Sequence, residues 1–162
     1  INTPEIIIRL SQKMKEKGIL PELEAFDSGM INFAKYLLKK KIIQAPNYMN
    51  LLFGNIACAQ ADLLHAGLMV RDLPENTYWS FAGIGNTQLM MNSLGIASGG
   101  GVRVGLEDNI YFNSSRTKLA TNSELLIRIH KLAKANERSV MKPRVLRKLL
   151  NLLPGNGNYG RE

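Results

Sequence analysis

The sequence contains a single cysteine, Cys58, among 162 residues. One cysteine excludes a disulfide within the chain, so a small disulfide-stapled fold is excluded and the reducing cytoplasm is the expected location. The sequence also lacks an apolar run of the roughly 20 residues that span a bilayer, and it shows no basic and apolar leader segment. We therefore expect a soluble chain without a membrane partner.

Acidic residues are scarce: 13 Asp and Glu stand against 21 Lys and Arg, which gives a formal net charge of +8. Such an excess can indicate nucleic-acid binding. Here many of the cations fall at the ends of predicted helices, as in Lys39–Lys41 and Lys131–Arg138, where they complement the helix dipole. No helix-turn-helix signal or aromatic platform is present, so we expect no nucleic-acid partner. A phosphate-bearing ligand such as a CoA ester would also suit this charge.

Apolar spacing and capping residues predict one helix followed by four strand and helix units. The first helix covers residues 1–18, and the strands are predicted at 23–26, 48–53, 78–82 and 102–106. A helix is expected after each strand. The first starts at Asp27, the second covers 61–70, and the third covers 87–98 with Asn86 as its cap. The fourth starts at the capping box that Thr121 and Glu124 form. A last helix starts near Pro143.

This alternation is typical of a parallel sheet covered by helices, and four units make half of an eight-unit (β/α)8 barrel. The predicted fold class is therefore α/β, with the C-terminal half of such a barrel over residues 1–153 and a flexible tail over 154–162. A small open doubly wound sheet stays an alternative. A complete barrel needs about 250 residues. The sequence also starts at Ile1 without an initiating Met, so we expect a fragment or a processed product that begins in mid-fold.

Both arrangements bind ligands at the carboxyl ends of the strands. At the last strand, Arg103 and Glu107 would share one face, and Asp108 would turn at the edge. Inward charge at a barrel mouth is costly unless it is paired or bound to a cation, which points to a site. A structural salt bridge is the alternative. For Glu22 and Glu24 we expect one side chain inside the barrel and one toward the helices, most simply in a salt bridge.

Gly83 and Gly85 follow the third strand and precede a helix, in the sequence Gly83-Ile84-Gly85-Asn86. A turn of this kind can present backbone N–H groups to a phosphate, so both glycines are candidates for binding a phosphate-bearing cofactor. Tight-turn geometry explains the same glycines equally well.

Four segments of the sequence carry a resemblance to a known family. They are Pro21-Glu22-Leu23-Glu24-Ala25-Phe26-Asp27-Ser28-Gly29-Met30, Trp79-Ser80-Phe81-Ala82-Gly83-Ile84-Gly85, Gly100-Gly101-Val102-Arg103-Val104-Gly105-Leu106-Glu107-Asp108-Asn109 and Ala120-Thr121-Asn122-Ser123-Glu124-Leu125. In this order they resemble the beta-keto acid cleavage enzymes of the 3-keto-5-aminohexanoate type, and the similarity runs over nearly the whole chain.

The resemblance implies a zinc-dependent acyl transfer in which a β-keto acid and acetyl-CoA give a new acyl-CoA and acetoacetate. By motif, Glu107 would be a zinc ligand, and Asp108 with Arg103 would form the catalytic dyad that positions and activates the keto acid. No redox cofactor is implied. The family's other zinc ligands are a His-x-His pair in the half of the barrel that this sequence lacks. The segment Asn55–Gln60 also replaces a glycine-rich run of the family, which bears on substrate specificity.

A half barrel exposes two strand edges, so we expect a partner. The partner is the N-terminal half of the barrel, on the same or a separate chain, or a second copy of this chain, and a homo-oligomer is expected. The isolated chain is expected to be inactive. The alternative function is a non-catalytic half-barrel scaffold or interaction protein.

Overall fold

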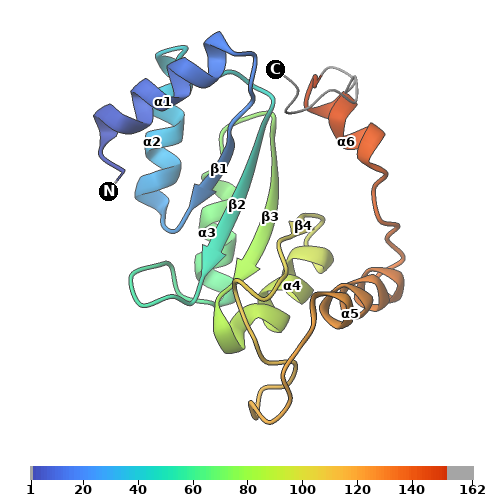
Figure 1. Cartoon of the computed structure of the whole chain (residues 1–162). Helices are drawn as coiled ribbons and strands as arrows, with labels where there is room; N and C mark the ends of the chain where they lie inside the picture. The colour runs from blue at the N-terminus through green and yellow to red at the C-terminus, as the bar shows by residue number, and fades with distance from the viewer. Residues whose placement is uncertain (1, 153–162) are drawn as a thin grey trace, which may run out of the picture.

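The structure of the chain is a computed structural model that describes residues 2–152. Figure 1 shows a helix followed by alternating strands and helices. The elements are α1 (Pro4–Glu16), β1 (Glu22–Ala25), α2 (Ser28–Lys39), β2 (Asn47–Phe53), α3 (Leu63–Arg71), β3 (Thr77–Gly83), the 3-10 turn η1 (Gly85–Thr87), α4 (Gln88–Ala97), β4 (Gly101–Val102), α5 (Asn122–Ala135) and α6 (Pro143–Leu149). The predicted tail, 154–162, lies outside the described residues.

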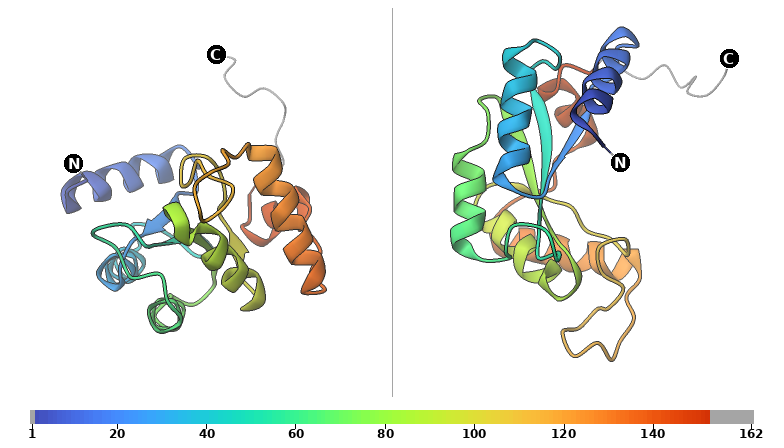
Figure 2. Two further views of the ribbon diagram at one scale, coloured as in Figure 1. Left: turned by 90° about the horizontal axis from the view of Figure 1, so that it is seen from below. Right: turned by 90° about the vertical axis from the view of Figure 1, so that its left-hand side faces the viewer.

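The four strands form one parallel sheet in the order β1-β2-β3-β4. Each strand pairs with the next one along the chain, and a helix connects each pair, as in a (β/α) barrel. Seen along the strands, α2 and α3 lie together on one side of the sheet (Figure 2). The predicted α/β fold with four parallel strand and helix units after a first helix, half of a (β/α)8 barrel, is confirmed.

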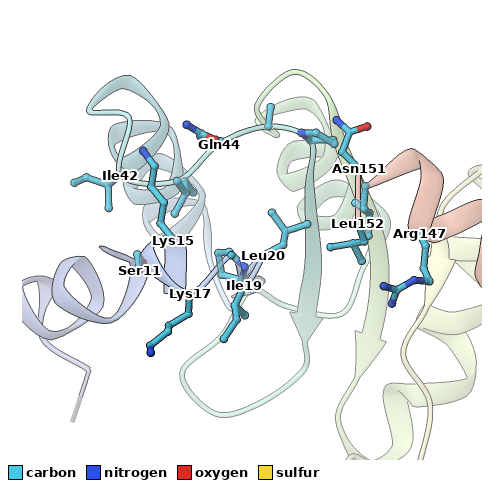
Figure 3. Close-up of a pocket in the computed structure, with 16 residues that line it drawn as sticks. Ser11, Lys15, Lys17, Ile19, Leu20, Ile42, Gln44, Arg147, Asn151 and Leu152 are labelled. Carbon is cyan, nitrogen blue, oxygen red and sulfur yellow. The ribbon is translucent and has the colours of Figure 1, made fainter. Parts of the chain in front are cut away.

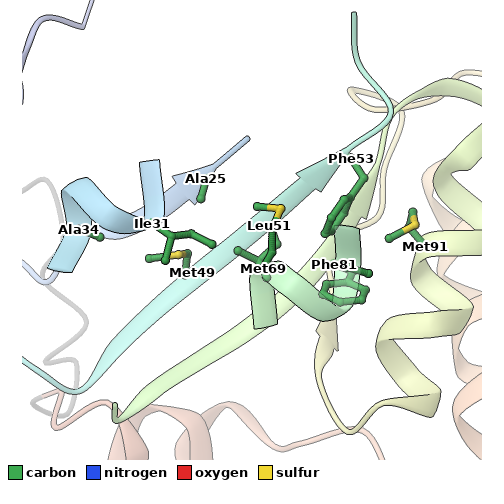
Figure 4. Close-up of a cluster of buried hydrophobic side chains, with 10 residues drawn as sticks. Ala25, Ile31, Ala34, Met49, Leu51, Phe53, Met69, Phe81 and Met91 are labelled. Carbon is green, nitrogen blue, oxygen red and sulfur yellow. The ribbon is translucent and has the colours of Figure 1, made fainter. Parts of the chain in front are cut away.

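One face of the sheet is apolar and packs against the helices. Alternate strand residues point to this face, because successive side chains of a strand alternate between its two sides. Phe53 and Phe81 meet edge to face with ring centroids 5.0 Å apart, and Figure 4 shows them beside residues of the helices. The buried cluster consists of Ala25, Ile31, Ala34, Met49, Leu51, Phe53, Ala66, Met69, Phe81 and Met91. Burial of this apolar surface holds the helices on the sheet.

The opposite face of the sheet, which would line the inside of a complete barrel, carries several polar side chains. Asn50 and Ser80 are buried there. The Asn50 amide donates to Glu22, and the Ser80 hydroxyl donates to Asn50. Glu24 lies on this same face, where it meets Arg103. The prediction that Glu22 and Glu24 point to opposite sides was wrong, because residues two apart on a strand share a face.

Short polar side chains start the helices as predicted in most cases. Asp27 Oδ1 accepts from the backbone N–H of Met30 at 2.9 Å at the start of α2. Thr121 and Glu124 form the predicted capping box of α5. The prediction that Asn86 caps α4 was wrong: residues Gly85–Thr87 form a 3-10 turn and α4 begins at Gln88.

The last strand is shorter than predicted, because only Gly101–Val102 pair with β3. The expected strand over 102–106, with Arg103 and Glu107 on one strand face, was wrong. The N–H of Arg103 still donates to the carbonyl oxygen of Phe81 at 3.0 Å. Beyond that bond, the carbonyls of Arg103 and Gly105 accept from side chains of α4 instead of from a neighbouring strand.

Arg138 was predicted to lie at the end of its own helix. It lies three residues beyond Ala135, and its guanidinium donates to the carbonyl oxygens of Ile96, Gly99 and Gly100 at the end of α4. The expected match of a cation with carbonyls at a helix C-terminus therefore holds for a different helix.

Within residues 2–152, no helix has the length and apolar character needed to cross a membrane.

Candidate functional site

The candidate site lies just after β4, at the end of the sheet to which the strand arrows point (Figure 1). Arg103 and Asp108 form a forked ion pair there: Nε and Nη2 of Arg103 each lie 3.2 Å from an oxygen of Asp108. The Asp108 side chain is 3% exposed and the Arg103 side chain 21%. A planar guanidinium that holds both oxygens fixes the orientation of the carboxylate.

Two further carboxylates approach the same guanidinium. Oε2 of Glu107 lies 3.0 Å from Nη2 of Arg103, and the Glu107 side chain is 84% exposed. Glu24, at the other edge of the sheet, pairs with Nη1 of Arg103. The predicted cluster of Arg103, Glu107 and Asp108 is thus brought together in space, although residues 103–108 do not form the predicted strand.

Glu24 is the member of this cluster that sequence reasoning did not place. It is in register with Asn50, Asn50 with Ser80, and Ser80 with Gly101. Ser80 and Gly101 are small, so the long side chain of Arg103 can reach toward Glu24 across this layer. The spacing of Glu22 and Glu24 at positions i and i+2 was the available signal, because it puts two carboxylates on one side of an edge strand.

The cluster has more negative than positive charge. Three carboxylates around one guanidinium leave two negative charges in excess. Burial raises the pKa of Asp108, Arg103 partly offsets this rise, and Glu107 and Glu24 add to it. Partial burial lowers the pKa of Arg103, but Asp108, Glu24 and Glu107 outweigh it, so this pKa is raised overall. The arrangement thus favours a positive ligand beside an aspartate that binds a proton more readily than usual.

Gly83 and Gly85, predicted to bind a cofactor, lie beside this cluster. A Cβ atom on Gly83 would lie 2.5 Å from the carbonyl oxygen of Thr87, so glycine is needed for the close packing of α4 on β3. Gly85 has a φ of +61°, and its N–H donates to the carbonyl oxygen of Asp108 at 2.7 Å. Nearby, Nε of Arg116 donates to Oδ1 of Asn86 at 2.9 Å. A role of the two glycines in cofactor binding stays a prediction.

The described residues supply only part of a metal site. No group of three or more His, Cys, Asp and Glu residues within 2–152 is arranged to hold a metal ion. Catalytic zinc sites use three protein ligands, so a zinc ion at Glu107 would need ligands from outside these residues. Nδ1 of His65 lies 2.8 Å from Asp62 on α3, and His130 is exposed on α5. Partial burial raises the pKa of the Cys58 thiol, which disfavours a thiolate ligand.

A hollow of about 760 Å³ lies at the other end of the strands, between α1 and α6. Its lining includes Lys15, Lys17, Ile19, Pro46 and Arg147, several of which Figure 3 shows around it. Parallel barrels bind their substrates at the carboxyl ends of the strands. This hollow is at the amino ends, so it does not define the candidate site.

Parallel strand and helix units, each strand paired with the next one along the chain, define the class of this protein as an α/β fold of the (β/α)-barrel type. The sequence comparisons then give the family. The family model of the beta-keto acid cleavage enzymes matches residues 1–152, and the chain belongs to this family.

Characterised relatives agree with this assignment. The chain is 35% identical over 153 residues to the 3-keto-5-aminohexanoate cleavage enzyme of Fusobacterium nucleatum, covering 94% of the chain and 55% of that relative. It is 34% identical over 155 residues to the enzyme of the same name from Acetoanaerobium sticklandii, covering 94% and 55%. It is 33% identical over 151 residues to the 3-dehydrocarnitine:acetyl-CoA trimethylamine transferase of Rhizobium meliloti, covering 93% and 50%. The chain therefore spans about half the length of the relatives it matches.

Proposed function

We propose that this chain is part of a zinc-dependent enzyme that converts a β-keto acid and acetyl-CoA into an acyl-CoA and acetoacetate. The observation that carries the proposal is the cluster of Arg103, Glu107 and Asp108 at the carboxyl ends of the strands, in a chain of this family. 3-Keto-5-aminohexanoate is the substrate we favour, because relatives that act on it are 34–35% identical to the chain.

Glu107 is the zinc ligand in this proposal. Its side chain is exposed at the mouth of the sheet, and the two excess negative charges around it suit a divalent cation. Bound zinc would act as a Lewis acid that polarises the ketone carbonyl of the substrate. The remaining ligands would come from the other half of the barrel, because one carboxylate does not make a catalytic zinc site.

Asp108 and Arg103 are the catalytic dyad. Arg103 holds the Asp108 carboxylate in one orientation through two hydrogen bonds. The raised pKa of Asp108 makes it a stronger base than an ordinary aspartate, which suits proton transfer to and from the keto acid. Gly83, Gly85 and the nearby Arg116 are proposed to border the path of the CoA phosphates, with the Arg116 guanidinium as the phosphate-binding group, because the N–H of Gly85 already donates to Asp108.

A partner half completes this enzyme. β1 and β4 are the two edges of the sheet formed by residues 2–152, and an open edge offers unpaired backbone groups. We propose that the N-terminal half of the barrel, on the same or a separate chain, pairs with both edges. A homo-oligomer and a cytoplasmic location belong to the same proposal, and the single cysteine supports the latter.

The test is the mass, zinc content and activity of the purified native protein. We expect a complete barrel with about one zinc ion per site that forms acetoacetate from acetyl-CoA and 3-keto-5-aminohexanoate. Glu107→Gln should weaken zinc binding at least about tenfold, whereas Glu75→Gln, an exposed glutamate before β3, should not. A single species of 18.0 kDa without zinc or activity would instead support the alternative function, a non-catalytic half-barrel scaffold.

A further inference from the structure

Helix α4 presents two buried side-chain amides to the segment that carries the candidate site. Gln88 and Asn92 are both 0% exposed. Nε2 of Gln88 donates to the carbonyl oxygen of Gly105 at 2.9 Å. Nδ2 of Asn92 donates to the carbonyl oxygens of Arg103, at 2.9 Å, and Phe81, at 3.1 Å. Both amides thus bind main-chain atoms of the segment that begins at Arg103.

These two amides are only partly satisfied. Oε1 of Gln88 and Oδ1 of Asn92 are buried and have no hydrogen-bond partner within the part of the chain that the structure describes. Leaving a buried polar atom without a partner costs about 1–3 kcal/mol. Leucine or methionine of similar size would avoid this cost. The hydrogen bonds that the N–H groups of these amides donate therefore stabilise the structure by more than the unpaired oxygens cost.

These donors take the place of the backbone hydrogen bonds that a neighbouring strand would supply. Pairing with β3 stops at Val102, so the carbonyl groups that follow pair with no strand within residues 2–152. Asn92 and Gln88 supply donors to two of them, and the N–H of Gly85 binds the carbonyl oxygen of Asp108 at 2.7 Å. The backbone is thereby attached to α4 and to the turn before it on both sides of Glu107.

Two glycines permit this close approach of α4. A Cβ atom on Gly83 would lie 2.7 Å from Cα of Gln88, and one on Gly95 would lie 2.8 Å from the carbonyl oxygen of Gly101. Both distances are too short for any residue with a Cβ atom at these two positions, unless the backbone moves. Both ends of α4 therefore sit close enough to the strands for its short amides to reach the main chain at Arg103 and Gly105.

We propose that Gln88 and Asn92 are positioning residues for the reaction proposed above. Asn92 fixes the peptide of Arg103, and Gln88 fixes the turn that brings Asp108 back onto the Arg103 guanidinium. Neither side chain touches the substrate. Because the inference rests on the proposed function, one of its tests has to work without catalytic turnover.

The kinetic test uses the complete enzyme and the isosteric variants Asn92→Leu and Gln88→Met. Misalignment of Arg103 and Asp108 in these variants should lower kcat about 10- to 100-fold, and KM for acetyl-CoA should change less than twofold. Ser93→Ala, the neighbouring residue of α4 whose hydroxyl bonds within the helix, is the matched control and should keep the wild-type kcat. Unchanged kcat in both amide variants would overturn the proposal.

A double-mutant cycle separates positioning from general stability. In an Arg103→Met background, Asn92→Leu should have little further effect on kcat, because it acts through Arg103. Fully additive losses would indicate a structural role and overturn the proposal. If Asn92→Leu does not fold, Gln88→Met completes the same cycle.

The side-chain Nε–H signal of Arg103 in the NMR spectrum provides the test without turnover. The signal is identified by its loss in Arg103→Lys. Asn92→Leu should shift it and speed its hydrogen exchange, since Nε–H donates to Asp108. If the wild-type protein has no cleavage activity but the signal responds, the proposed function fails and the positioning stands. An unchanged signal would overturn the positioning in either case.

Discussion

The sheet of β1–β3 and the segment after β4 are held together in different ways. In the sheet, parallel strands pair through their backbones, and an apolar face with Phe53 and Phe81 packs against helices. In the segment from Arg103 to Thr121, side chains of α4 and α5 bind the backbone at Arg103, Gly105 and Leu106, and the loop that follows is closed by its own backbone and asparagine hydrogen bonds. The site residues Arg103, Glu107 and Asp108 all belong to the second region. The site segment thus depends on the rest of the chain for its shape.

The largest effect is expected from a substitution in the first region, the sheet of β1–β3. Phe81→Ala removes a fully packed ring that meets both Phe53 and Trp79 and should lower the free energy of unfolding by about 3–5 kcal/mol. Urea unfolding of the chain measures this. Tyr78→Phe, at an exposed position of β3 three residues earlier, should change it by less than about 0.5 kcal/mol. Equal losses in the two variants would contradict the distinction between the two faces of the strand.

An intermediate effect is expected where the two regions join. Gly83→Ala places a Cβ atom 2.5 Å from the Thr87 carbonyl oxygen and should cost about 1–3 kcal/mol. Gly67→Ala, on α3 where nothing lies within 4 Å, should instead stabilise the chain by up to about 1 kcal/mol. Thermal unfolding of both variants tests this. A tolerated Gly83→Ala would remove the packing explanation and favour a role for Gly83 in ligand binding.

The smallest expected effect is at the end of the second region. Thr121→Ala removes the cap of α5 and should cost about 1 kcal/mol. Ser123→Ala, an exposed neighbour in the first turn of the helix, is the control. Chemical unfolding of the two variants at neutral pH makes the comparison.

The same capping box predicts a dependence on pH. The Lys118 ammonium lowers the pKa of Glu124, as do the N–H and hydroxyl groups of Thr121. A carboxyl with a lowered folded-state pKa contributes stability above its unfolded pKa, and this contribution is lost as the pH falls through the folded pKa. The difference in unfolding free energy between the wild type and Glu124→Gln should therefore shrink below about pH 4. A difference that does not change with pH would argue against a charged capping box.

The sequence predicted the first region well because its signals are local. Asp27 caps α2 through a bond to a residue three positions away, and apolar periodicity shows strands that have one buried face. The end of β4 was not predictable in this way. Val104 and Leu106 continue an apolar alternation, but the pairing is decided by amides of α4 that are 11 and 17 residues away from their acceptors in the chain.

The candidate site was predicted in part for the same reason. The motif that carries Arg103, Glu107 and Asp108 is contiguous, so resemblance could identify these residues together. Glu24 reaches Arg103 from 79 residues away; the i, i+2 spacing of Glu22 and Glu24 indicates that they share a face of the strand, but not which residue Glu24 binds. The roles assigned to Glu107, Gly83 and Gly85 stay predictions until zinc and CoA binding are measured.

Trp79 gives the molecule a built-in optical probe. It is the single tryptophan of the sequence, and its ring lies so close to Gly100 that an added Cβ would be 2.1 Å from Cζ3. Gly100 belongs to the short connection between α4 and β4, three residues before Arg103. The emission of this indole therefore reports on the connection that precedes the site, and a change in that connection can be followed by fluorescence without any added label.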